Sequence, residues 1–131
     1  MRRLLVLAAF AVLGAACRNE GPVAGELAVR LEAPQPTERG IQFEVVGRAH
    51  GVALPPGAAY QVFADSSSDG DTTYVIVVAP ASSGLLAGDL ARIRVSDNRS
   101  VAGYSVRAIA LANSQYGADT TLGVVLRVVR P

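Results

Sequence analysis

Residues 41–45 read Ile-Gln-Phe-Glu-Val, and this short stretch decides the fold class. Its apolar side chains, Ile41, Phe43 and Val45, alternate with the polar side chains of Gln42 and Glu44. Successive side chains of an extended strand point to opposite faces, so this alternation predicts a half-buried β-strand. We expect the three apolar side chains to face a core and the two polar ones to face solvent.

Similar stretches recur along most of the chain and predict an all-β domain. We expect further strands at residues 27–32, 60–64, 72–78, 90–95, 104–111 and 122–129, and a short edge strand at 52–54. Turn-forming glycine, proline, serine, asparagine and aspartate residues separate nearly all of them, and no helix is expected beyond one turn within residues 83–91. Seven or eight such strands predict an antiparallel β-sandwich, immunoglobulin-like or jelly-roll-like, over residues 26–131.

The N-terminal residues differ from this body and have the three parts of an export signal. Arg2 and Arg3 are followed by the apolar run 4–13 and then by small residues. A basic start, a short apolar stretch and a small-residue cleavage site define a secretory signal peptide. The uncharged stretch 4–16 is too short for a helix that spans a bilayer. We therefore expect a helical signal peptide at residues 1–16.

Cys17, the single cysteine of the chain, directly follows these small residues. This arrangement resembles the lipobox of bacterial lipoproteins, although Gly14 stands where that family prefers leucine. The resemblance implies cleavage before Cys17 and attachment of lipid to its thiol, with residues 17–25 as a tether. The residue after the cysteine is Arg18 rather than aspartate, which resembles the signal for onward sorting to the outer membrane. The alternative is a soluble secreted protein with an unmodified Cys17.

Two strand patterns of the body resemble the sandwich domains of the cohesin type. Residues 25–29 read Gly-Glu-Leu-Ala-Val, and residues 88–95 read Gly-Asp-Leu-Ala-Arg-Ile-Arg-Val. In that family a sheet face binds a small partner module, so the resemblance implies a sandwich with an interaction surface. It transfers no contact residue, because no distinctive motif is shared.

Composition argues against nucleic acid as a partner. The net charge of the whole chain is +1, and all 12 basic residues are arginine. A body that is nearly neutral offers no basic face for a run of phosphates. We therefore expect no nucleic-acid partner.

The loop 65–71 is the one stretch of the sequence that resembles a metal-binding loop. Asp65, Asp69 and Asp71, with Ser67 between them, resemble the start of an EF-hand calcium loop. The twelfth position, which should hold a bidentate glutamate, is Ile76 within a predicted strand. A solvated hairpin tip explains the same residues. The three aspartates are thus a calcium candidate, and we expect no resident metal or cofactor.

The sequence contains no recognisable set of catalytic residues. His50 is the only histidine, and no serine lies in a Gly-x-Ser-x-Gly elbow. Tyr116 lies in a turn and is the candidate for an exposed ring that binds a ligand. The sequence therefore predicts a non-enzymatic, membrane-anchored envelope lipoprotein that binds a protein or glycan. Alternatives are a structural or accessory subunit of an envelope complex and, more remotely, an unrecognised hydrolase.

Overall fold

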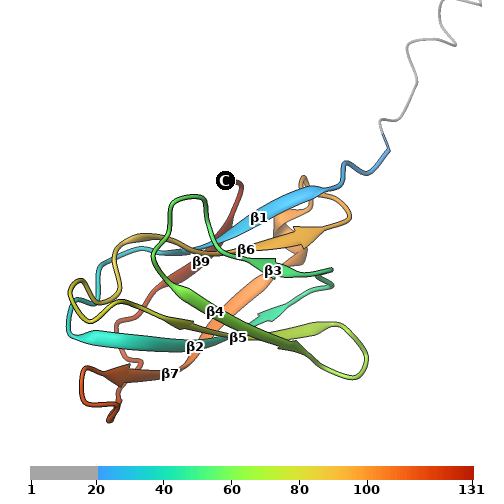
Figure 1. Cartoon of the computed structure of the whole chain (residues 1–131). Coiled ribbons are helices and arrows are strands. Elements are labelled where there is room, and N and C mark those ends of the chain that lie inside the picture. Colours follow the sequence, from blue (N-terminus) through green and yellow to red (C-terminus); the bar gives the residue numbers. More distant parts are fainter. Residues whose placement is uncertain (1–20) are drawn as a thin grey trace, which may run out of the picture.

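A computed structural model describes residues 21–131, which form a sandwich of two antiparallel sheets (Figure 1). Sheet I has the strand order β3-β6-β1-β9, and sheet II has the order β4-β5-β2-β7-β8. The strands of sheet I are β1 (Gly25–Leu31), β3 (Val52–Ala53), β6 (Gly88–Val95) and β9 (Leu126–Val129). Those of sheet II are β2 (Glu38–Val46), β4 (Gln61–Ser66), β5 (Thr72–Val78), β7 (Ser105–Asn113) and β8 (Ala118–Asp119). The all-β sandwich is therefore confirmed.

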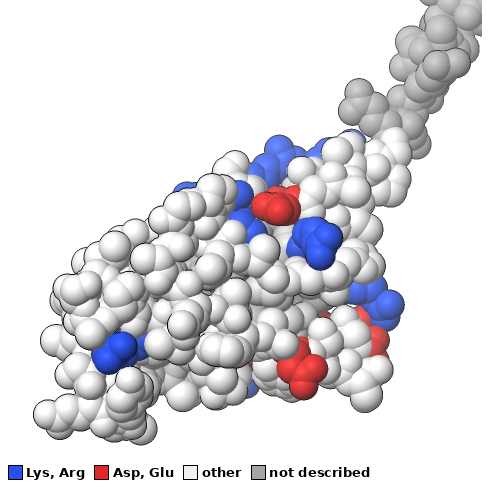
Figure 2. Space-filling view, viewed as in Figure 1, with Lys and Arg blue, Asp and Glu red and all other residues white. Residues whose placement is uncertain are grey.

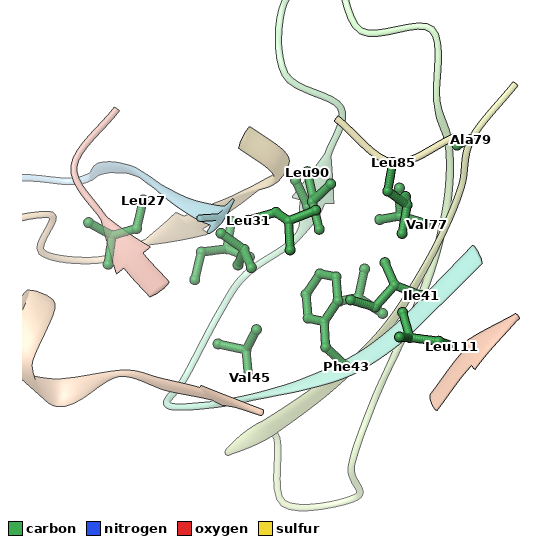
Figure 3. Close-up of a cluster of buried hydrophobic side chains, with 14 of the residues drawn as sticks. Leu27, Leu31, Ile41, Phe43, Val45, Val77, Ala79, Leu85, Leu90 and Leu111 are labelled. Atoms are coloured by element: carbon green, nitrogen blue, oxygen red, sulfur yellow. The ribbon is translucent and has the colours of Figure 1, made fainter. Parts of the chain in front are cut away.

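The alternation that predicted β2 also fills the core. Ile41, Phe43 and Val45 are buried on the inner face of sheet II, as expected. Across the sandwich they meet the buried side chains of β1 and β6, among them Leu31 and Leu90 (Figure 3). Phe43 lies in the middle of this cluster and is fully buried. The core is thus built from the inward half of each alternating strand.

A bulge in β6 adds one residue that strict alternation misses. Val29 of β1 pairs with Ala91, whereas the next residue, Arg30, pairs with Asp89. Leu90 is left over between the two pairs, so Leu90 and Ala91 are both buried. The local shift explains why two consecutive residues of β6 face the core.

Strand bounds near the C-terminus differ from the expected ones. Instead of one strand over residues 122–129, the structure has only β9, at Leu126–Val129. A turn precedes it, with the Val124 N–H donating to the Thr121 carbonyl and Gly123 at a positive φ of 82°. The short strand β8 was not expected. The described chain has a single 3-10 turn, η1 at Val101–Gly103, in place of the turn expected within residues 83–91.

The start of the sandwich is joined to the body before β1 begins. Val23 donates its N–H to Asp97 Oδ1 (3.3 Å) and accepts a hydrogen bond from the Asn98 N–H (2.9 Å). The expected signal peptide at residues 1–16, together with Cys17 and Arg18, lies outside the described residues. Among residues 21–131, no helix is long and apolar enough to span a membrane.

Candidate functional site

The outward face of sheet II carries many apolar side chains, although strand alternation exposes this face to solvent. On β5, the residues that point away from the core are Thr72, Tyr74, Ile76 and Val78, and none of them is charged. Phe63 of β4 pairs directly with Ile76 and is 58% exposed. Single exposed apolar residues are ordinary, but a contiguous group across two strands marks a candidate interaction site.

The same surface continues across β2 and β7. Gln42 of β2 pairs with Ile76 on one side and with Ala110 of β7 on the other. Gly40 likewise pairs with Val78 and with Ala112. We call this surface the apolar face and define it by Gly40, Gln42, Phe63, Tyr74, Ile76, Val78, Ala110 and Ala112.

Small side chains make a hollow in the apolar face. Its floor includes Gly40, Ala110 and Ala112, which carry at most a methyl group, and its volume is about 240 Å³. Arg39 and Tyr116 also line it. Three side chains of this lining carry hydrogen-bonding groups: Arg39, Gln42 and Tyr116. The hollow therefore suits an apolar group.

The turn between β7 and β8 presents Tyr116 at this hollow. Asn113 Oδ1 accepts hydrogen bonds from the N–H groups of Gln115 (3.0 Å) and Gly117 (2.9 Å), which fixes the turn. Tyr116 itself has a positive φ of 61° and is 72% exposed. Its ring lies 5.5 Å from the guanidinium carbon of Arg39, within cation–π range. The expected exposure of the ring is confirmed, and its role in binding stays a prediction.

A buried carboxyl group lies near the same corner. Glu38, at the start of β2, is 5% exposed, and its Oε2 atom has no hydrogen-bond partner among residues 21–131. Burial, together with a hydrogen bond and charge repulsion from Asp119 of β8, raises the pKa of Glu38 to about 7. This corner is therefore sensitive to pH near neutrality.

A wider groove lies between β7 and the segment that precedes β9. It has a volume of about 630 Å³ and is lined by Val106–Ile109, Thr121 and Val124–Leu126. Arg107 is the only charged residue in this lining, and its guanidinium is already ion-paired with Glu44 (2.7 Å). The groove gathers neither aromatic rings nor free charges, so the apolar face is the stronger candidate.

The calcium candidate forms the tip of the β4–β5 hairpin. Asp69 Oδ1 accepts hydrogen bonds from Ser67 Oγ (2.6 Å) and from the Asp71 N–H (3.0 Å). The Ser67 hydrogen bond lowers the pKa of Asp69 below its usual value. Asp71 is paired with Arg48 (3.3 Å). These contacts account for the polar residues as a turn, and calcium binding by Asp65, Asp69 and Asp71 stays a prediction.

The remaining candidates do not come together. His50 is exposed beside the edge of sheet I, where its N–H donates to the Arg94 carbonyl (2.8 Å). Within residues 21–131, no group of three or more histidine, cysteine, aspartate or glutamate side chains is placed to hold a metal ion. Cys17 lies outside the described residues.

The outward face of sheet I has the opposite character. Asp89 accepts from Arg30 Nε (2.8 Å) and lies 3.2 Å from Arg92 Nη2. Arg92 also contacts Glu26 (3.5 Å), and a further pair joins Arg127 to Glu32 (3.0 Å). In Figure 2, charged side chains gather over β1 and β6 and at the β4–β5 hairpin tip, whereas uncharged atoms cover most of the region of β4 and β5.

No family model matches the chain, and no curated protein or solved structure is detectably similar to it.

Proposed function

We propose that this chain is a non-enzymatic lipoprotein of a bacterial cell envelope whose sandwich binds a protein partner through the apolar face. The single observation that carries the binding function is the exposed apolar surface of β4 and β5, with Phe63 and Ile76 at its centre. The lipid anchor rests on Cys17, which follows a short apolar run and small residues. Several acyl chains on one cysteine would hold the protein at a membrane.

The chemistry of the apolar face favours a protein over a glycan. A sugar needs a hydrogen-bond partner for most of its hydroxyl groups. Within the hollow, those partners reduce to Gln42, Arg39 and the Tyr116 hydroxyl. Apolar and aromatic side chains are, in contrast, the main constituents of the buried centre of a protein–protein interface. A partner that presents apolar side chains therefore matches the surface best.

Site-specific photo-crosslinking in intact cells tests the binding function. The photoreactive p-benzoylphenylalanine replaces Phe63, which is aromatic and 58% exposed, so the fold tolerates the change. The matched control carries the same group at Arg127, whose side chain is 67% exposed on sheet I. We expect a discrete crosslinked protein from position 63 and none from position 127. No crosslink from position 63, or the same products from both positions, contradicts the proposal.

The anchor has a separate test. Mass spectrometry of the protein isolated from membranes should show a chain that begins at Cys17 and carries a lipid adduct. The Cys17→Ser variant should lose the adduct and leave the membrane fraction. An unmodified chain with another N-terminus contradicts lipidation and leaves the apolar face untouched.

A further inference from the structure

We propose that the partner seated on the apolar face is a second copy of this chain, packed face to face with its strands antiparallel to those of the first. This inference rests on the proposed function, because it names the protein that the apolar face binds. Sheets that pack face to face bury their apolar sides against each other, as the two sheets of one copy already do. Two-fold related copies use the same surface patch on both sides.

The cross-strand register defines where the two-fold axis lies. Phe63, Ile76, Gln42 and Ala110 form one row across β4, β5, β2 and β7. An axis along this row, perpendicular to the strands, places each copy's row over the row of the other copy. Ile76 then meets Ile76 of the partner subunit, and Gln42 meets Gln42 of the partner subunit.

Gln42 is the one polar side chain in this row, and its amide suits a two-fold axis. Among the described residues, its side-chain amide has no hydrogen-bond partner. An amide carries both donor and acceptor groups, so two copies of Gln42 satisfy each other. A carboxylate or an amine at this position would face a like charge instead. The central polar group is thus self-complementary.

The charges along β2 are complementary under the same axis. Arg39 stands three residues before Gln42, and Glu44 stands two residues after it. The antiparallel arrangement therefore brings Arg39 near Glu44 of the partner subunit, and the reciprocal pair forms at the other end.

Atoms on both sides of this contact are free to make it. Among residues 21–131 the Arg39 guanidinium has no carboxylate partner; its Nε is buried, and the group lies over the Tyr116 ring. Both contacts from Arg107, through Nε (3.0 Å) and Nη2 (2.7 Å), go to Oε1 of Glu44. Oε2 of Glu44 therefore remains available for a second cation.

Sedimentation equilibrium in a density-matched detergent tests the inference on the full-length protein isolated from membranes. We expect the protein mass of a dimer for the wild type. Ile76→Arg places like charges against each other on the axis and should raise the dissociation constant about 100-fold or more. Arg127→Glu, a charge change on sheet I, should leave the dimer intact. All three proteins share the same N-terminus, so association through an anchor cannot produce this difference.

The outcomes separate this inference from the binding function. A wild-type protein that stays monomeric, or a dimer that Ile76→Arg does not weaken, overturns the second copy as partner. If the crosslink from position 63 then has the mass of a different protein, the binding function stands and only the identity of the partner is wrong. If position 63 also yields no crosslink, both fail. A circular dichroism spectrum unchanged by Ile76→Arg excludes misfolding as the cause of dissociation.

Discussion

The outward faces of the two sheets arise from the same strand alternation but differ in chemistry: sheet I carries several ion pairs, whereas sheet II combines the Arg107–Glu44 pair with the apolar face. On sheet I, Arg30 and Arg92 share the carboxylate of Asp89. On sheet II, the equivalent outward positions hold Phe63 and Ile76. The fold requires only the inward residues, so the outward ones are free to serve another purpose. Sheet I pairs Arg30, Arg92 and Arg127 with carboxylates, whereas sheet II presents apolar side chains that nothing in residues 21–131 covers.

The largest expected effect is a difference in unfolding free energy between substitutions on the inner and the outer surface of sheet II. Phe43→Ala removes a fully buried ring from the core and should lower the free energy of unfolding by about 3–5 kcal/mol. Phe63→Ala, on the outer surface, should change it by less than about 0.5 kcal/mol in the monomeric Ile76→Arg background. Urea unfolding followed by circular dichroism measures both. A large loss of unfolding free energy from Phe63→Ala would show that the apolar face stabilises the fold and is not only an interaction surface.

Glu38 provides the next largest effect, through pH. Its pKa is raised from 4.5 to about 7 in the folded chain, so the native state holds a proton that the unfolded chain has released. The stability should therefore be highest below pH 4.5, fall as the pH rises toward 7, and level off above that value. The fall should be about 3 kcal/mol by linkage.

The control for this prediction is Glu38→Gln, which keeps the shape and removes the titration. Its unfolding free energy should lose most of the dependence on pH between 4.5 and 7. Equal slopes for the variant and the wild type would contradict the raised pKa of Glu38.

On sheet I, Asp89→Asn should cost about 1–2 kcal/mol, since Arg30 and Arg92 lose a charged partner. Asp89 and Arg92 are only 15% and 19% exposed, which limits replacement of the carboxylate by water. Thermal unfolding measures this loss. The dimer should be unaffected, because the change lies on the other face; dissociation by Asp89→Asn would contradict the assignment of the interface to sheet II.

The smallest effect concerns Asp97, which joins the start of the chain to the body. Hydrogen bonds from the Arg99 side chain and from the N–H groups of Arg99 and Val23 lower its pKa to about 2. Its contribution to stability should therefore be present above pH 3.8 and disappear as the pH falls toward 2. The difference in urea midpoint between wild type and Asp97→Ala should shrink over that range. A difference that is constant from pH 5 to pH 2 would contradict this.

Local patterns in the sequence predicted the sandwich and most of its inward side chains. Ile41, Phe43 and Val45 followed from alternation alone, because burial of one face is a local property of a strand. Alternation did not predict Leu90, which faces the core only because of a bulge against β1. Nor did it show that β9 is short, since the turn at Gly123 depends on backbone geometry.

The apolar face was not predictable in the same way. The stretch 72–78 is apolar on both faces, so the sequence does not show which residues are exposed. The face also needs β2, β4, β5 and β7 side by side, and the pairing of β2 with β7 joins segments far apart in the chain. Tyr116 was found from its turn-forming neighbours, but its position beside Arg39 required the structure.

Hydroxyl-radical footprinting of the aromatic side chains tests the central claim most directly. If the apolar face is an interface between copies, Phe63 and Tyr74 should be oxidised slowly in the wild-type protein and much faster in the Ile76→Arg variant. Leu122, which is 87% exposed and is not one of the residues of the apolar face, should react equally in both. Equal oxidation of Phe63 and Tyr74 in the two proteins, at the rate expected for exposed rings, would contradict the account.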